Sequence, residues 1–244
     1  MSVHLEILRR ARMEGELYST AVIAPSAEPE RRAAARRPPV RDQWQQLVHE
    51  LFLRRESETA AIGLASATAG EGTSFVARHL AAELARMSER PTLLLELNVY
   101  RPVQASAHGV EPDPGLRRLL ASREFPVEEC LRETGVQHLW VLPAGSGGPS
   151  GGTPDWMCLP RVLDALRRQF RALVVDLPPV NLSSDATIAA RWLEGLVLVT
   201  EADACSREVI QSATARLRRA NPNLLGAVLN KRRFVVPEAV YRRL

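Results

Sequence analysis

The chain has few of the residues that mark secreted, metal-clustered or membrane-spanning proteins. Its three cysteines, Cys130, Cys158 and Cys205, have neither the pattern of a disulfide framework nor the spacing of metal ligands. Its longest apolar runs, such as 93–95 and 172–175, are far shorter than the roughly 20 residues that span a bilayer. The N-terminus also lacks the apolar stretch and cleavage site of a secretory signal. We therefore expect a cytoplasmic protein.

Lysine and aromatic residues are scarce as well. Lys231 is the only lysine, aromatic residues make up 5% of the chain, and the net charge is +4. The arginines are spread over many segments instead of forming one stripe with stacking aromatics, which argues against nucleic-acid binding. A zinc cluster or a catalytic triad is not indicated either, because the histidines lack suitably spaced partners. These histidines are His4, His49, His79, His108 and His138.

What remains is the composition of an ordinary globular protein. With 244 residues, 45% of them hydrophobic, the chain can bury one sizeable core, so we expect one main domain. The sequence divides into an N-terminal amphipathic helix at 1–18, a flexible linker at 19–41, the main domain at 42–230 and a C-terminal tail at 231–244. The linker is predicted because Ala, Pro, Arg and Glu dominate it and large apolar residues are almost absent.

Two helices have an apolar face that either docks a partner or packs on the chain's own domain. The first, at 3–17, carries Leu5 and Leu8 at helical spacing. The second, at 42–54, carries Trp44 and Leu51. The sequence leaves both uses open for each helix.

Short apolar runs then alternate with helical patterns, which predicts an α/β fold in which helices cover both faces of a parallel sheet. The expected strands are 61–66, 92–97, 138–142, 172–176, 195–200 and 225–230. The expected helices are 74–87, 154–168, 185–192 and 206–219.

The first expected strand runs into SATAGEGTS, residues 66–74, and then into a helix. Strand, glycine-containing loop and helix N-terminus are the context of a phosphate-binding loop, in which backbone N–H groups face the phosphates. The G-x-x-x-x-G-K-[ST] pattern would be met, with Ala67 as its first small residue, if Thr73 were lysine. A plain strand-turn-helix remains the alternative for this segment alone.

Two further segments favour the phosphate site. TLLLELNVYRP, at 92–102, and FRALVVDLPPV, at 170–180, are apolar strands that end in acidic or amide residues. Magnesium ligands occupy such strand ends in P-loop enzymes.

Together these segments resemble the cytoplasmic domain of the bacterial tyrosine kinases of capsule and exopolysaccharide export. The motifs of that family run S-x-x-x-G-E-G-K-S/T, L-L-I-D-x-D-x-R-x-P and V-I-I-D-x-P-P-V. Four shorter segments fall in the same order: PGLRRLLAS at 114–122, VLPAG at 141–145, SDA at 184–186 and GAVLN at 226–230. The resemblance covers about residues 42–230 and implies a P-loop NTPase-type fold.

The resemblance also implies which residues form the site. ATP or ADP would bind at Gly70, Glu71, Gly72, Thr73, Ser74 and Asn230. Magnesium would be held by Ser74 and Asp176, and the catalytic positions would be Glu96, Asn98 and Asp176, with Arg101 and Pro102 kept nearby.

Several of these positions depart from the family. Thr73 replaces the lysine that neutralises the phosphates, and Glu96 and Asn98 replace two aspartates. Losing one charged hydrogen bond weakens binding about 10- to 150-fold, and losing a transition-state donor slows chemistry by a further factor of about 100 to 1,000. We therefore expect weak nucleotide and magnesium binding and little or no phosphoryl transfer.

The parts that the family uses for assembly and phosphorylation are also altered. Its oligomer helix resembles E-x-x-R-x-x-R, whereas the matching positions here are Asp42, Gln45 and Val48. The family's tyrosine-rich tail is reduced to Tyr241, which is either a phosphosite or a packing residue. Homo-oligomer formation is left open.

The resemblance implies a regulator or scaffold of polysaccharide synthesis, held at the inner membrane by a membrane chain-length regulator (a polysaccharide co-polymerase). One alternative is a residual tyrosine autokinase or ATPase in which Arg78 or Arg101 replaces the missing lysine. Another is a partitioning-type P-loop ATPase, which is less favoured because those proteins have K-G-G-x-G-K at the loop.

Overall fold

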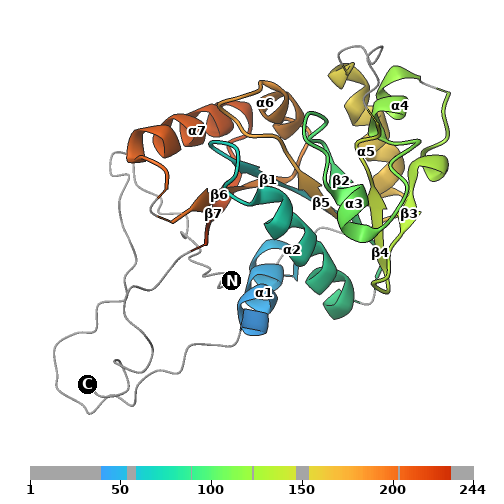
Figure 1. Cartoon of the computed structure of the whole chain (residues 1–244), viewed down its shortest axis with the longest axis horizontal. Coiled ribbons are helices and arrows are strands. Elements are labelled where there is room, and N and C mark those ends of the chain that lie inside the picture. Colours follow the sequence, from blue (N-terminus) through green and yellow to red (C-terminus); the bar gives the residue numbers. More distant parts are fainter. Residues whose placement is uncertain are drawn as a thin grey trace.

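A computed structural model of the chain describes residues 40–53, 59–88, 90–122, 124–146, 154–202 and 204–231 (Figure 1). The expected N-terminal helix at 1–18, nearly all of the linker at 19–41 and the tail after Lys231 lie outside these residues. In the part of the chain that the structure describes, no helix is long and apolar enough to cross a bilayer.

A seven-stranded sheet with the order β3-β4-β2-β5-β1-β6-β7 forms the centre of the domain. Its strands are β1 (Ala60–Ser66), β2 (Thr92–Glu96), β3 (Arg132–Glu133), β4 (Leu139–Leu142), β5 (Ala172–Asp176), β6 (Gly195–Glu201) and β7 (Leu224–Asn230). Every strand pair is parallel except β3 with β4, so the predicted parallel sheet is correct apart from one short antiparallel edge strand. The strand β3 was not predicted, because two residues are too short for a periodic pattern.

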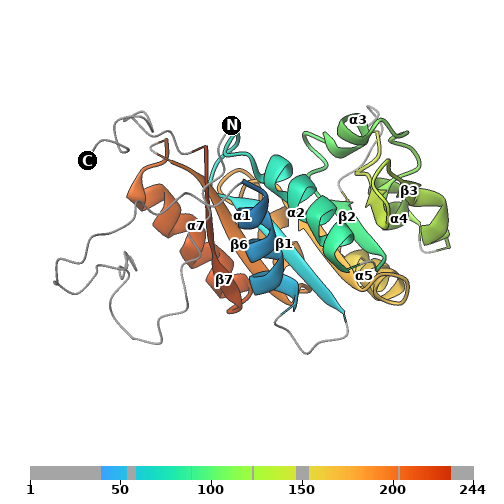
Figure 2. The same cartoon turned by 90° about the horizontal axis from the view of Figure 1, so that it is seen from below.

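Helices cover both faces of this sheet, as Figures 1 and 2 show. The α-helices are α1 (Val40–Val48), α2 (Thr73–Ser88), α3 (Gln104–His108), α4 (Leu116–Ala121), α5 (Leu159–Arg167), α6 (Asp185–Ala190) and α7 (Arg207–Ala220). A π-helical turn, His49–Leu53, extends α1, and two 3-10 turns, Val127–Cys130 and Trp156–Cys158, complete the set. The expected helix at 154–168 therefore begins as a 3-10 turn, and the short helices α3 and α4 were not predicted.

The alternation of side chains along the strands produces two separate cores. In β1, Ile62 and Leu64 pack with α1 and α2, whereas Ala61 and Ala65 face the opposite side, where α4, α5, α6 and α7 lie. All residues of β1, β2 and β5 are buried, as expected for central strands of a sheet covered on both faces.

The helix predicted at 42–54 uses its apolar face inside the domain. Trp44 is 7% exposed and Leu51 is 5% exposed, and the Trp44 ring stacks on His79 of α2 with centroids 5.6 Å apart. Of the two uses that the sequence left open, packing on the chain's own core is correct for this helix.

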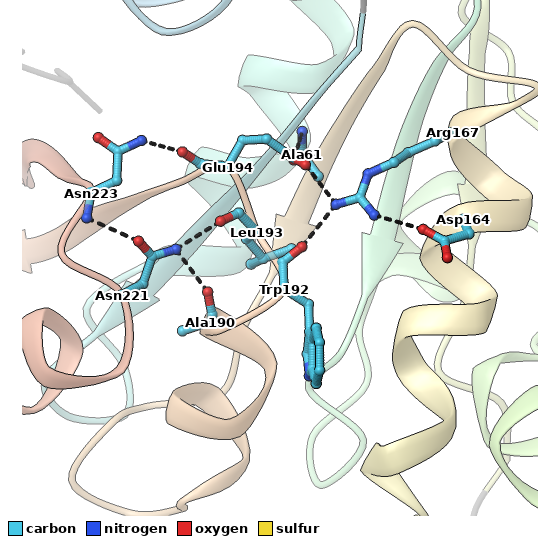
Figure 3. Close-up of polar contacts among 9 residues, drawn as sticks. All are labelled: Ala61, Asp164, Arg167, Ala190, Trp192, Leu193, Glu194, Asn221 and Asn223. Atoms are coloured by element: carbon cyan, nitrogen blue, oxygen red, sulfur yellow. Dashed lines mark hydrogen bonds and ion pairs between the residues drawn. The ribbon is translucent and has the colours of Figure 1, made fainter.

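A polar network holds the amino ends of β1, β6 and β7 together (Figure 3). One oxygen of the Glu194 carboxylate accepts the N–H of Ala61 at 2.7 Å, and the other accepts Arg167 at 2.7 Å. The Asn221 side chain donates to the carbonyls of Ala190 and Leu193 at 2.8 and 2.7 Å. These contacts lie at the end of the sheet opposite the loop that follows β1, so they stabilise the fold without entering the site described next.

Candidate nucleotide site

The loop between β1 and α2, residues 67–72, is shaped by two glycines with left-handed backbone angles. Gly70 has φ 92° and Gly72 has φ 91°, conformations that residues with a Cβ rarely adopt. A Cβ on Gly72 would also collide with the side-chain amide of Asn230. Such a turn directs successive N–H groups toward one side and ends at the N-terminus of α2, which is the arrangement of an anion-binding loop.

The Glu71 side chain stabilises the loop through hydrogen bonds to Thr68. Its Oε1 accepts hydrogen bonds from both the N–H and the hydroxyl of Thr68, each at 2.7 Å, and the residue is 3% exposed. The Glu71 side chain therefore holds Thr68 through Oε1, while its Oε2 has no partner among the described residues.

A cavity of about 490 Å³ opens beside this loop, a size typical of small-ligand sites. Its walls come from the loop and the start of α2, from the segment after β2 and from the segment after β5. The lining residues include Gly70, Gly72, Thr73, Ser74, Phe75, Asn98, Tyr100, Arg101, Val103, Leu177, Pro178, Pro179 and Leu182. The Thr73 hydroxyl is buried and has no partner among the described residues, so the position expected to carry a lysine presents an unsatisfied neutral group there.

Asp176, at the carboxyl end of β5, is fully buried next to the loop. Its Oδ2 accepts the Gln104 side-chain amide at 2.7 Å. Burial raises the pKa of Asp176 to about 7, while the Gln104 hydrogen bond and the nearby Ser74 side chain oppose the rise and the neighbouring Glu96 adds to it. Oδ1 has no partner in the described part of the chain, although Asp176, like Glu96, is 0% exposed and is not among the residues that line the cavity.

Glu96 pairs with Asp176 in the sheet, yet its carboxylate serves a different purpose. Its Oε1 accepts the N–H groups of Val103 and Gln104 at 2.5 and 2.8 Å, and its Oε2 accepts the N–H of Ala144 at 3.1 Å. Burial raises its pKa, and the three backbone bonds counteract that effect. Glu96 is 0% exposed and does not line the cavity, so it joins the loops that follow β2 and β4.

The segment after Glu96 lines the cavity with residues that are not carboxylates. Asn98 and Arg101 both face it, whereas the guanidinium of Arg78 lies over the Phe75 ring, 5.8 Å from its centroid. Counting along D-x-D-x-R-x-P places Tyr100, and not Arg101, at the motif's arginine. The Tyr100 hydroxyl donates to Asp185 at 2.6 Å, and this bond raises its pKa.

Two residues of the site were missed in the sequence analysis. Gln104 is fully buried and its amide joins Asp176 to the Ser74 carbonyl, but nothing in its local pattern distinguishes it from a surface glutamine. Lys231 reaches the loop from the end of β7, and its Nζ donates to the Gly70 carbonyl at 2.6 Å. Its being the only lysine, next to Asn230, was the signal that could have found it.

No protein-family model matches the chain. It is 28% identical over 179 residues to the tyrosine-protein kinase CpsD of Streptococcus agalactiae, covering 71% of this chain and 76% of CpsD. The kinase domain of the Escherichia coli tyrosine kinase ETK superposes with a TM-score of 0.69 at 23% identity, over 82% of this chain and 78% of that domain.

The fold extends to nucleotide-binding proteins of other function. The septum site-determining protein MinD of Pyrococcus horikoshii, solved with Mg-ADP, superposes with a TM-score of 0.64 at 23% identity, over 76% of each chain. At that identity the likeness concerns the fold alone. Taken with its P-loop architecture, the similarity to CpsD over nearly three quarters of this chain supports a relationship to the bacterial tyrosine-kinase family.

Proposed function

We propose that the chain is a catalytically impaired member of this family that regulates or scaffolds capsular or exopolysaccharide synthesis and export. The observation that carries the proposal is the Glu96 carboxylate, which accepts three backbone N–H groups and stays out of the cavity. A residue held in this way is not available to bind a metal or to take a proton from a tyrosine hydroxyl.

Two further features of the site favour slow phosphoryl transfer. Thr73 offers no charge to a phosphate, and the Gln104 amide already donates to Asp176. Phosphoryl transfer is accelerated mainly by positioning the reactants and by neutralising the charge that develops in the transition state. Both features therefore lower its rate.

The residues present fit an anion better than a metal. The loop glycines and the start of α2 suit the phosphates of ATP or ADP. Ser74 and the unpartnered Oδ1 of Asp176 are the groups that would hold magnesium, which would supply charge neutralisation at the phosphates. With neither Glu96 nor a second aspartate available, we propose weak binding of both.

A membrane chain-length regulator of the export system is the partner that we propose, with the chain on the cytoplasmic side of the inner membrane. The family resemblance is the basis of this assignment. The second candidate is a residual autokinase or ATPase, favoured by Arg101, which lines the cavity and could approach a phosphate.

A pair of variants in the native producer separates the two readings. Asp176→Asn removes the acidic side chain that we propose for magnesium, and Arg101→Met removes the candidate cation. Under the regulatory reading both variants restore polymer output in a deletion strain to the level of the unchanged chain. Loss of output in both, at unchanged protein abundance, would establish the kinase or ATPase reading instead.

A further inference from the structure

The last residue of β7, Asn230, and the residue that follows it, Lys231, both have side chains that reach the loop after β1. The Asn230 amide donates to the Glu71 carbonyl at 2.9 Å, and the Lys231 ammonium donates to the Gly70 carbonyl at 2.6 Å. Lys231 has φ 56°, a left-handed conformation unusual for a residue with a Cβ. Glu201, at the end of β6, accepts the same ammonium at 2.8 Å. The only lysine of the chain is therefore fixed beside the phosphate-binding loop.

The two acceptors belong to consecutive peptide groups. The Gly70 carbonyl shares its peptide with the N–H of Glu71, and the Glu71 carbonyl shares its peptide with the N–H of Gly72. Within the described residues, neither of these N–H groups donates a hydrogen bond to the protein. A donor placed on a carbonyl oxygen polarises the peptide and makes its N–H a stronger donor, most of all when the donor is charged.

The geometry points to Lys231, assisted by Asn230, as a positioning residue. By donating to loop carbonyls from the outer side of the loop, it makes the loop N–H groups stronger donors to a diphosphate or triphosphate group. The ammonium binds a carbonyl of the loop, so it does not replace a lysine that contacts phosphate directly. It instead brings a positive charge to a loop in which Thr73 supplies none. The inference deepens the proposed function, because it concerns the weak anion binding of that site, and it requires no phosphoryl transfer.

The competing explanation is a purely structural clip, in which Lys231 only holds the loop against Glu201 and the end of β7. Both partners of the ion pair are partly exposed, Lys231 at 34% and Glu201 at 28% of their side chains, so the pair itself adds little to stability. A clip would affect the folding of the loop but would not make anion affinity depend on the charge at position 231.

Calorimetric titration of the full chain with inorganic pyrophosphate and with ADP, without metal, tests the inference. It compares Lys231→Met, which keeps the aliphatic stem, with Lys231→Arg, which keeps the charge. Arg218→Met is the control for lost net charge, since Arg218 lies in the last turn of α7 and does not line the cavity. The same variants are made in a Thr73→Lys background, which provides measurable affinity if the unchanged chain binds too weakly.

We expect Lys231→Met to weaken pyrophosphate and ADP by the same factor, about 5- to 10-fold, because both ligands use the loop. Lys231→Arg should recover most of the loss, and Arg218→Met should change affinity less than about 2-fold. Weakening of ADP alone would overturn the inference, since it would place Lys231 against the nucleoside. Unchanged affinity for both ligands would overturn it as well.

Glu201→Gln keeps the inference testable if Lys231→Met fails to fold. It leaves the ammonium on the Gly70 carbonyl while removing the competing carboxylate, so pyrophosphate affinity should stay equal or rise. A clear fall in affinity would show that the ion pair acts only as a clip. Tight ADP binding with rapid turnover in the unchanged chain would sink the proposed function and leave this inference standing.

Discussion

Thr73 shows how far a single residue can be interpreted from sequence. The loss of a lysine was visible in the motif, and the structure places the Thr73 hydroxyl, buried and unpartnered, at the cavity wall. The orientation of Glu96 could not be predicted in the same way. A side chain one methylene longer than aspartate reaches the amides of two other loops, and their positions depend on tertiary structure.

Restoring the lysine tests the residue that the motif singles out. Thr73→Lys should raise ADP affinity by about 1.5–3 kcal/mol, the value of a charge-assisted hydrogen bond to phosphate. ATP turnover should remain poor, because Glu96 stays bonded to the backbone. Calorimetry measures the first effect and phosphate release the second. Rapid turnover in this variant would mean that the segment after β2 is not impaired.

The buried Asp176 predicts an unusual dependence of stability on pH. Its pKa rises from the ordinary 3.8 to about 7 in the folded chain, so across that window the folded state holds a proton that the unfolded state releases. The free energy of unfolding should therefore fall as pH rises from about 4 to about 7 and then level off. Asp176→Asn should flatten this contribution. Urea unfolding with EDTA at several pH values measures it, and an equal slope in both proteins would contradict the assignment.

Glu96→Asp returns the family residue, yet we expect it to destabilise the chain. A shorter carboxylate cannot keep all three backbone N–H bonds, and one buried donor left unpaired costs about 1–3 kcal/mol. Thermal and urea unfolding measure this loss. Undiminished stability together with new magnesium binding would show that the loops adapt and that the glutamate is not needed to join them.

At the scale of elements, every strand except β3 was predicted within one or two residues, because their continuous apolar runs are typical of a sheet buried on both faces. The helices were less exact. The short α3 lacks a helical pattern, and its first residue, Gln104, has its N–H bound by Glu96 and its side chain bound to Asp176. Such an element is determined by tertiary contacts, which no local pattern carries.

The network at the amino ends of the strands gives a prediction at this scale. Asn221→Ala should lower the free energy of unfolding by about 1–3 kcal/mol, because the buried carbonyls of Ala190 and Leu193 lose their donor (Figure 3). Asn181→Ala is a matched control, since that side chain accepts only a long hydrogen bond of 3.4 Å from Arg216 within the described residues. Equal effects of the two substitutions would show that the network does not stabilise the sheet.

For the whole molecule, the sequence predicted the α/β architecture and the family correctly, whereas the surface that contacts a partner stays a prediction. Burial of Trp44 and Leu51 removes one of two helices considered for docking. The helix at 3–17, outside the described residues, remains the candidate for contact with a membrane partner.

Leu5→Asp with Leu8→Asp should therefore reduce co-purification with the chain-length regulator and lower polymer output, because charges on the apolar face disfavour docking. The melting temperature should hardly change. Tyr241→Phe is the companion variant and should leave output unaltered. If Tyr241→Phe abolishes output and the double variant does not, autophosphorylation is the working activity of the chain.

The three backbone bonds of Glu96 also bear on how the site could be redesigned. A substitution at position 96 breaks bonds that join two loops, so it acts on stability whatever it does to chemistry. The Thr73 hydroxyl has no partner among the described residues, so a substitution there breaks no such bond. A redesign toward phosphoryl transfer should therefore begin at Thr73 and change Glu96 only after the loops that follow β2 and β4 have another anchor.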